Sequence, residues 1–220
     1  MDVVFASNDN YARHLAVAMY SLMDHNQVAE RIRIFILSVD ISRENQEKLS
    51  AVVRRFTREI IFIPMGNLKE KFPYDIETGG FDISTMSRLF IGTMLPEDVE
   101  RVLYLDCDTV VLGSLKKLWN LDLHGKIMGA VLEPTIYNSL KPALGLREND
   151  PYFNAGVLLI DLKNWRKKHI EAQILSFYQK LGGQTFGCDQ DLLNGTLKGK
   201  IRVLSPRYNS AVRSSPPVFL

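Results

Sequence analysis

Short apolar runs alternate with amphipathic helical patterns along the chain, and this alternation is what most restricts its fold. Each run has the length of a buried strand, and polar turn residues separate it from the next helical pattern. Strands that alternate with long helices form βαβ units around a mostly parallel sheet. We therefore predict an α/β fold with a mostly parallel central sheet flanked by helices. The expected strands are Asp2–Ala6, Ile32–Val39, Glu59–Ile63, Arg101–Leu105, Ile127–Leu132, Gly156–Asp161 and Ile201–Leu204.

The helical patterns between these runs predict one domain. After Ser42, a candidate N-cap, Leu49, Val52, Val53 and Phe56 follow the i, i+3, i+4, i+7 spacing of a buried helix face. A chain of 220 residues suits one domain, which we expect over residues 1–213, with residues 214–220 as a frayed tail. The other expected helices are Tyr11–Asn26, a helix that Ser84 caps and that stops before Pro96, Lys163–Leu181 and Asp189–Leu197.

The composition excludes several classes of protein. With 27 basic and 25 acidic residues, the net charge of +2 is too even to indicate nucleic-acid binding. The cysteines Cys107 and Cys188 give no disulfide framework, and no apolar run reaches the ~18 residues of a membrane span. We expect a soluble cytoplasmic protein without a signal peptide. Basic clusters such as 166–168 are expected to be solvated helix faces, or a weak contact with the inner membrane face. The oligomeric state is not predicted.

Polar residues gather where predicted strands end. The stretch 7–11 follows the first strand, Asp106 and Asp108 follow the fourth, and Glu133 follows the fifth. In open α/β sheets the ligand binds beyond the carboxyl ends of the strands. This pattern predicts a site at that edge of the sheet.

The stretch RVLYLDCDTVVL sets two aspartates into apolar sequence. In an extended segment Asp106 and Asp108 share a face while Cys107 points to the opposite one. Two carboxylates about 4 Å apart repel by roughly 4 kcal/mol at an effective dielectric constant near 20. Either one is protonated or a cation lies between them, and oxygen ligands favour Mg²⁺ or Mn²⁺. The alternative is that the pair only caps the turn around Ser114.

Two metal-using chemistries suit such a pair. A metal can neutralise the diphosphate of a nucleotide-sugar while the sugar departs. The motif also resembles the first motif of haloacid-dehalogenase-type phosphatases, in which Asp106 would be the nucleophile and Asp108 the acid. That second class expects the motif near the start of the chain, followed by a lysine and an acidic pair, and the chain has no such set.

Five stretches occur in the order seen in glycosyltransferase family 8. They are VVFASNDNYARHLAVAMYSL, ISTMSRLFIGTMLP, RVLYLDCDTVVLGSLKKLW, YFNAGVLLIDLKNWR and FGCDQDLLNGTLKGKIRVLSPRYN. The chain most resembles the bacterial lipopolysaccharide galactosyltransferases of that family. The resemblance implies a Rossmann-like nucleotide-diphospho-sugar (GT-A) fold. It also implies a Mn²⁺- or Mg²⁺-dependent enzyme that moves galactose or glucose from a UDP-sugar to a saccharide or glycolipid acceptor with retention, in lipopolysaccharide or other cell-surface glycan synthesis.

The resemblance assigns the loop after the first strand to the uridine. Asn8, Asn10 and Tyr11 would contact it, with the Tyr11 ring stacked on uracil and the amides bonded to base and ribose. The galactosyltransferases carry Asp where this chain has Asn8. The alternative for this loop is a helix-capping cluster.

The resemblance places Arg88 beside the pyrophosphate and the donor sugar, and makes Asp106 and Asp108 the metal ligands, with Asp106 also near the sugar hydroxyls. A guanidinium matches phosphate oxygens well. The alternative for Arg88 is an exposed helix arginine.

Asn154, Ala155, Asp189 and Gln190 are the remaining donor-site residues that the resemblance implies, with Asn154, Asp189 and Gln190 near the reaction centre. Asp189 would bond to donor hydroxyls, and Gln190 would face the β side of the sugar. Because an amide is a poor nucleophile, we expect front-face attack, with Gln190 stabilising positive charge on the sugar. The alternative is that Asp189 only caps its helix.

One departure from the family pattern opens a second hypothesis. The family takes a third metal ligand from the histidine of a C-terminal HxxGxxKPW block, and this sequence has no such block. His14, His25, His124 and His169 lie elsewhere in the sequence. The alternative function is a catalytically impaired protein that binds UDP-sugars.

Overall fold

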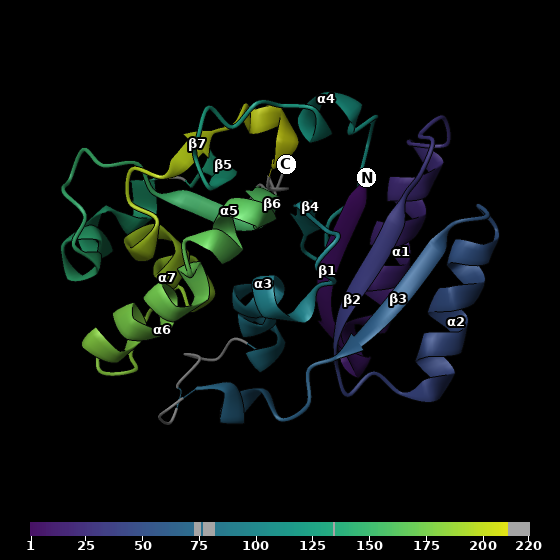
Figure 1. The fold of residues 1–220 in the computed structure, drawn as a ribbon, viewed down its shortest axis with the longest axis horizontal. Helices are drawn as coiled ribbons and strands as arrows, with labels where there is room; N and C mark the ends of the chain where they lie inside the picture. The colour runs from purple at the N-terminus through teal and green to yellow at the C-terminus, as the bar shows by residue number, and fades with distance from the viewer. Residues whose placement is uncertain (73–75, 77–81, 134, 211–220) are drawn as a thin grey trace, which may run out of the picture.

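The computed structural model describes residues 1–72, 76, 82–133 and 135–210, and these residues form a seven-stranded sheet (Figure 1). The strand order is β3-β2-β1-β4-β6-β5-β7. The strands are β1 (Asp2–Asn8), β2 (Arg33–Val39), β3 (Glu59–Pro64), β4 (Arg101–Leu105), β5 (Met128–Leu132), β6 (Phe153–Asp161) and β7 (Ile201–Val203). All seven predicted strands are therefore confirmed, although β6 starts three residues before the predicted Gly156.

Four of the strand pairs are parallel, and β6 is the exception. β1 pairs in parallel with β2 and β4, as β2 does with β3 and β5 with β7. β6 runs antiparallel between β4 and β5. Its first residues therefore lie at the edge where β4 and β5 end, as the pairing of Leu105 with Val157 and of Leu132 with Phe153 shows. This reversal brings Asn154 and Ala155 to the same edge as the aspartate pair.

Helices cover both faces of the sheet (Figure 1). Along β1, Val3 and Phe5 pack toward α1 and α2, while Val4 and Ala6 join the core on the side of α3, α5, α6 and α7. Both faces of the strand are thus buried, which explains its continuous apolar run. The helices are α1 (Ala12–Asp24), α2 (Arg43–Arg54), α3 (Ile91–Met94), α4 (Lys116–Trp119), α5 (Leu162–Lys167), α6 (Ile170–Lys180) and α7 (Asp189–Thr196).

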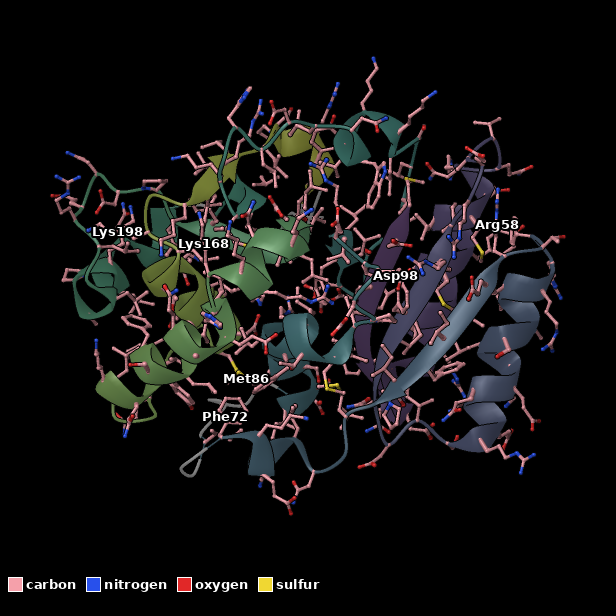
Figure 2. The ribbon with its side chains drawn as sticks, in the orientation of Figure 1. Arg58, Phe72, Met86, Asp98, Lys168 and Lys198 are labelled. Carbon is pink, nitrogen blue, oxygen red and sulfur yellow. The ribbon has the colours of Figure 1, made fainter. Side chains whose placement is uncertain are left out.

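The remaining helical segments are 3₁₀ turns. They are η1 (Asp9–Tyr11), η2 (Leu68–Lys71), η3 (Ile83–Phe90), η4 (Thr135–Leu144) and η5 (Pro206–Tyr208). Phe72 and Met86, both labelled in Figure 2, belong to the core on the η3 side of the sheet. Within the described ranges no helix is long and apolar enough to cross a bilayer.

Two predicted helices differ from the structure. The expected helix Lys163–Leu181 is two helices, because His169 takes a left-handed conformation (φ 50°) between α5 and α6. The expected cap at Ser84 is wrong, since the Asp82 side chain accepts a hydrogen bond from the Ser84 amide and opens η3, which continues into α3. Ser42 does cap α2, accepting from the amide of Asn45. The predicted tail, residues 214–220, lies outside the described residues.

Candidate functional site

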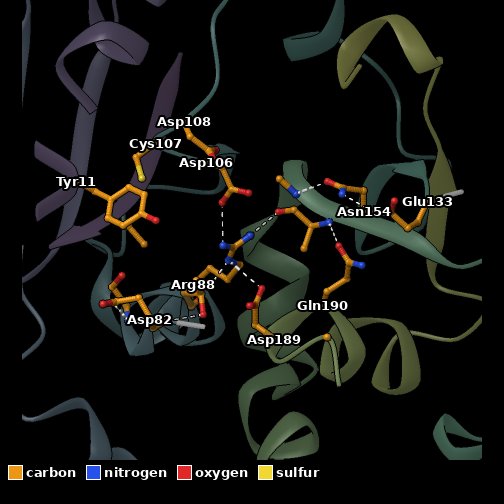
Figure 3. A pocket seen from close by; sticks show the side chains of 16 residues that line it. Tyr11, Asp82, Arg88, Asp106, Cys107, Asp108, Glu133, Asn154, Asp189 and Gln190 are labelled. Atoms are coloured by element: carbon orange, nitrogen blue, oxygen red, sulfur yellow. Dashed lines mark hydrogen bonds and ion pairs between the residues drawn. The ribbon is translucent and has the colours of Figure 1, made fainter. Parts of the chain in front are cut away.

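A cavity of about 450 Å³ opens at the edge where β1, β4 and β5 end and β6 begins (Figure 3). Its position is the one expected of a ligand site in an open α/β sheet. Its described lining consists of Ala6, Tyr11, Asp82, Ser84, Thr85, Arg88, Asp106, Cys107, Asp108, Glu133, Asn154, Ala155, Gly156, Gly187, Asp189 and Gln190. Eight of the ten predicted site residues are in this set, and Asn8 and Asn10 are not.

Arg88 lies at the centre of the cavity wall. Its Nη2 is 2.8 Å from Asp106 Oδ1, and its Nε is 3.0 Å from Asp189 Oδ2 (Figure 3). Nη1 donates to the carbonyl oxygen of Ala155 at 2.6 Å, and the guanidinium lies 4.4 Å from the centre of the Tyr104 ring. Arg88 is only 5% exposed, so the alternative of an exposed helix arginine is wrong.

The cavity is lined by more negatively than positively charged side chains. Five carboxylates line it, and Arg88 is the only guanidinium or ammonium group among its described lining residues. Burial raises the pKa of Asp189 to about 6, against the opposing effect of Arg88. Burial alone would lower the pKa of Arg88, but Asp106 and Asp189 hold it above its ordinary value. A diphosphate could enter such a cavity only together with compensating positive charge.

The aspartate pair lies in a turn rather than in an extended strand. β4 ends at Leu105, and the Thr109 amide donates to the carbonyl oxygen of Asp106 at 3.2 Å. Cys107 also lines the cavity, but its side chain packs against the core on the α1 side of the sheet, whereas Asp106 contacts Arg88 and Tyr104 on the other side, as predicted. The turn at Ser114 has a cap of its own, since the Ser114 hydroxyl accepts from the amide of Lys116.

One oxygen of Asp106 is held from two sides. Oδ1 accepts from the Tyr104 hydroxyl at 3.1 Å as well as pairing with Arg88. Oδ2 lies against Gly156, where a Cβ atom would come within 2.9 Å of it. A side chain at residue 156 would therefore fill the space beside this oxygen.

These carboxylates suit a hard divalent cation with few protein ligands. Among the described residues no three His, Cys, Asp or Glu side chains converge on one point. Mg²⁺ is commonly held by one or two carboxylates, with substrate phosphates and waters as its other ligands. Asp106 and Asp108, in a cavity with excess negative charge, match that pattern.

The loop after β1 divides into a capping part and a lining part. The Asn8 side chain accepts from the amide of Tyr11 at 3.1 Å and donates to Asp82 Oδ2 at 2.7 Å. Asn8 is thus the cap of η1, as the alternative for this loop proposed, and Asn10 is exposed. Tyr11 lines the cavity, and its side chain is labelled at the edge of Figure 3.

Asn154 joins three segments of the chain. Its Oδ1 accepts from the amide of Gly156 at 2.7 Å and from Asn209 Nδ2 at 2.6 Å. Its Nδ2 donates to Glu133 Oε2 at 2.5 Å. These contacts fix the orientation of the amide, and Glu133 enters the site as its partner.

Asp189 and Gln190 form the first turn of α7. The N-cap position belongs to Cys188, which has φ 51°, so the alternative of Asp189 as a helix cap is wrong. Gln190 Oε1 accepts from the amide of Ala155 at 2.9 Å, and its Nε2 donates to the Tyr152 hydroxyl at 3.4 Å. The carbonyl of Ala155 binds Arg88, so this short backbone segment joins Arg88 to Gln190.

The sequence patterns missed four residues that build this site: Asp82, Thr85, Tyr152 and Asp191. Asp191 was visible only as the last letter of CDQD, and Tyr152 only as the first letter of YFNAG. Their roles depend on contacts between distant segments, which no local pattern records. The four histidines are absent from the described lining of the cavity.

Comparisons with known proteins agree with this geometry. The family model "Glycosyl transferase family 8" matches residues 2–215. A putative glycosyltransferase of Haemophilus influenzae is 30% identical over 213 residues, which are 95% of this chain and 63% of that protein. A lipopolysaccharide 1,2-glucosyltransferase of Escherichia coli is 33% identical over 130 residues, 56% of this chain and 37% of its own length.

The solved structures point the same way. The galactosyltransferase LgtC, in complex with donor and acceptor sugar analogues, superposes with a TM-score of 0.83 at 34% identity, covering 94% of this chain and 74% of LgtC. The chain thus spans less than two thirds of the H. influenzae relative and about three quarters of LgtC. The match over residues 2–215 favours the glycosyltransferase interpretation of the aspartate motif over the phosphatase. The chain belongs to glycosyltransferase family 8 and has the GT-A fold of its LgtC neighbours.

Proposed function

We propose that this protein is a retaining hexosyltransferase that moves galactose or glucose from a UDP-sugar to a saccharide or glycolipid acceptor. The observation that carries the proposal is the acidic cavity, in which buried Arg88 bridges Asp106 and Asp189 beside an aspartate-bearing turn. We assign the work to a GT-A domain over residues 1–213, in cytoplasmic synthesis of lipopolysaccharide or another cell-surface glycan.

The nucleotide end of the donor would lie between Tyr11 and the aspartate turn. Tyr11 is 42% exposed and lies on the cavity wall, where its ring would offer an aromatic face for uracil. Asp106 and Asp108 would hold Mn²⁺ or Mg²⁺, and the bound cation would supply the positive charge that the diphosphate needs. The donors of Arg88 are largely taken by protein oxygens, so it would act chiefly by fixing the two carboxylates and the carbonyl of Ala155.

The sugar end would lie between Asp189 and Gln190. Asp189 would accept hydrogen bonds from donor hydroxyls, and Asn154, fixed by Glu133 and Asn209, would shape the wall beside the sugar. The amide of Gln190 is a poor nucleophile, so a covalent sugar–enzyme bond is not expected. We infer front-face attack: the acceptor oxygen bonds to the anomeric carbon as the bond to the diphosphate breaks, and the departing phosphate takes the acceptor proton. The Gln190 dipole would stabilise the developing positive charge.

A donor screen tests this proposal. UDP-galactose and UDP-glucose with Mn²⁺ should release UDP, faster with a saccharide acceptor, while ADP-glucose and GDP-mannose should compete poorly. Equal use of the purine nucleotide-sugars would contradict the uridine assignment. Hydrolysis of a simple phosphomonoester through an aspartyl-phosphate at Asp106 would revive the phosphatase.

The second candidate is a protein that binds UDP-sugars without transferring the sugar. It is favoured by the small number of cation ligands, since the described residues supply only Asp106 and Asp108 at the turn. Calorimetry with UDP and Mn²⁺ separates the two. Binding without UDP release from any UDP-hexose would favour this candidate, and binding with release favours the transferase.

A further inference from the structure

A buried tyrosine–aspartate pair lies behind Gln190, outside the set of residues assigned above to donor or metal. Asp191 is 1% exposed, and its Oδ2 accepts from the amides of Phe186 and Gly187 at 2.9 and 2.7 Å. Its Oδ1 accepts from the hydroxyl of Tyr152, which is also buried. The carboxylate is thus bound by three donors and fixes both the 186–187 backbone and the tyrosine.

The direction of these hydrogen bonds determines which way the amide of Gln190 can face. The Tyr152 hydroxyl donates to Asp191 Oδ1, so its proton points to Asp191 and its lone pairs face Gln190. Those lone pairs accept from Gln190 Nε2, while the amide of Ala155 donates to Gln190 Oε1. A flipped amide would set oxygen against oxygen at Tyr152 and N–H against N–H at Ala155.

The loop that precedes α7 is built around the same pair. A Cβ atom on Gly187 would come within 2.9 Å of Asp191 Oδ1 and 3.0 Å of the Tyr152 hydroxyl, so a larger residue would push them aside. The Gln190 amide nitrogen donates to the carbonyl of Gly187 at 3.0 Å. Backbone and side chain of Gln190 therefore both depend on Tyr152 and Asp191.

We propose that Tyr152 is a positioning residue that sets the orientation of the Gln190 side-chain amide, and that Asp191 fixes the direction of the Tyr152 proton. Neither residue needs to touch the sugar. The effect on turnover rests on the transferase function proposed above, whereas the orientation of the amide does not.

Reversing the proton direction tests the proposal. In Asp191→Asn, the side-chain oxygen of the new residue can still accept hydrogen bonds from the amides of Phe186 and Gly187. Its NH₂ group then donates to the Tyr152 hydroxyl. The tyrosine proton turns toward Gln190 and opposes the native amide orientation. Tyr152→Phe removes that proton altogether. Asp191→Asn alone should therefore be worse than the double variant, although the double variant carries more changes.

Two measurements report the orientation of the Gln190 side-chain amide. The first is the NMR shift of the Ala155 amide proton, which should move upfield in Asp191→Asn, stay near its native value in Tyr152→Phe and return toward that value in the double variant. The second is turnover with UDP-hexose and acceptor. Misplacement of a reacting group costs on the order of 10²-fold, so kcat should fall by about that factor in Asp191→Asn and recover at least about tenfold in the double variant, with KM for the donor little changed.

Two control variants and several possible outcomes make the proposal refutable. Asp122→Asn and Tyr20→Phe, at exposed positions, should leave both readouts at native values. A double variant as poor as Asp191→Asn, or an Ala155 shift that does not respond, overturns the proposal. If Asp191→Asn does not fold, Tyr152→Phe decides alone: a fall in kcat of more than about tenfold with the native Ala155 shift retained would contradict a positioning role. A wild type that transfers no sugar refutes the proposed function, while the NMR test still stands.

Discussion

Two buried arginines each bridge a pair of aspartates, at opposite ends of the same sheet. At the amino ends of β1 and β2, Arg33 contacts Asp2 at 2.6 Å and Asp98 at 2.7 Å, and it lies 5.3 Å from the centre of the Phe35 ring. At the carboxyl ends, Arg88 has the same surroundings, with two aspartates and an aromatic ring. We call these groups the Arg33 cluster (Arg33, Asp2 and Asp98) and the Arg88 cluster (Arg88, Asp106 and Asp189).

The hydrogen bonding of the two clusters differs. Arg33 binds Asp2 through both Nε and Nη2, and Nη1 donates to Asp98, which is labelled in Figure 2 and whose side chain is 63% exposed. In the Arg88 cluster, Asp189 is almost fully buried, and its Oδ2 is close to Arg88 without an aligned hydrogen bond in the described structure.

Because of this difference in hydrogen bonding and burial, the pKa values of Asp98 and Asp189 are shifted in opposite directions. The hydrogen bond from Arg33 lowers the pKa of Asp98, whereas burial raises the pKa of Asp189 to about 6. The Arg33 cluster is thus a satisfied structural contact. The Arg88 cluster keeps a buried carboxylate oxygen, Asp189 Oδ2, without a hydrogen bond. Under the proposed function the donor would supply the missing hydrogen bond, so similar residues would serve stability at one end of the sheet and binding at the other.

The largest expected effect is on folding and comes from removing the central cation of the Arg88 cluster. Arg88→Met should lower the free energy of unfolding by about 3–5 kcal/mol, because it leaves buried carboxylates without a counter-charge. Urea denaturation measures the loss. Arg33→Met should cost less, since water reaches Asp98. A larger loss for Arg33→Met would reverse the comparison.

The second largest expected effect is on turnover and concerns only the cavity next to the Arg88 cluster. Gln190→Ala should retain the product anomer and lose about 10²–10³ in turnover, or about 3–4 kcal/mol, as expected for one transition-state dipole. Steady-state kinetics and NMR of the product measure it, with exposed Gln179→Ala as the control. A loss on the order of 10⁶, or a sugar adduct on Gln190, would indicate a nucleophile and contradict front-face attack.

The clusters should also respond to pH with opposite sign. The pKa of Asp189 is higher in the folded chain than its ordinary value of 3.8, so the folded state loses stability as pH rises from about 4 to about 6. A shift to about 6 amounts to about 3 kcal/mol. Relative to wild type, Asp189→Asn should therefore gain stability between pH 4 and pH 7.

Asp98→Asn supplies the contrasting measurement. Its folded pKa is lowered, so its contribution is present above the ordinary pKa and disappears as pH falls. Relative to wild type, urea denaturation should show Asp189→Asn gaining stability from pH 4 to pH 7, and Asp98→Asn changing little there. The opposite trend, that of Asp98→Asn, should appear as pH falls below about 4. Trends of the same sign would show that the two clusters are electrostatically alike.

The smallest expected effect is on UDP affinity, and it compares two exposed carboxylates, Asp108 and Asp98, at opposite ends of the sheet. Asp108→Ala should keep the fold and lose at least about tenfold in Mn²⁺-dependent affinity for UDP, the lower range for disturbing a metal site. Asp98→Ala, at the other end of the sheet, should bind UDP as wild type does. Calorimetry with Mn²⁺ and with a chelator measures both. Equal UDP affinity with and without metal would remove the cation from the proposal.

The sequence predicted the elements well because each strand and helix carries a local pattern. It also predicted that polar residues after β1, β4 and β5 would meet, and Tyr11, Asp106 and Glu133 do line one cavity. Arg88, Asp189 and Gln190 came from family resemblance rather than from local chemistry. The burial of Arg88 could not be read from one arginine in a helical segment, because its partners come from β4 and the turn after it, from β6 and from α7.

The errors have physical causes of the same kind. The strand rule expected the aspartate pair in an extended segment, but the chain turns after Leu105, at the end of β4. β6 begins earlier than its pattern because the side chain of Asn194 binds both the amide and the carbonyl of Phe153, at 2.8 Å each. The left-handed backbone conformation of His169 separates α5 from α6, and nothing in the neighbouring sequence predicts that conformation.

The antiparallel insertion of β6 between β4 and β5 also bears on the order in which the chain can fold. β1, α1, β2, α2 and β3 pair with their neighbours in sequence, so this half can form from local contacts. The contact between the Asp106 amide and the carbonyl of Gly156 joins residues far apart in sequence, and such contacts form slowly. On a ribosome, Arg88 and Asp106 emerge well before Ala155 and Asp189. We therefore expect donor binding to be acquired late, after the N-terminal half is already folded.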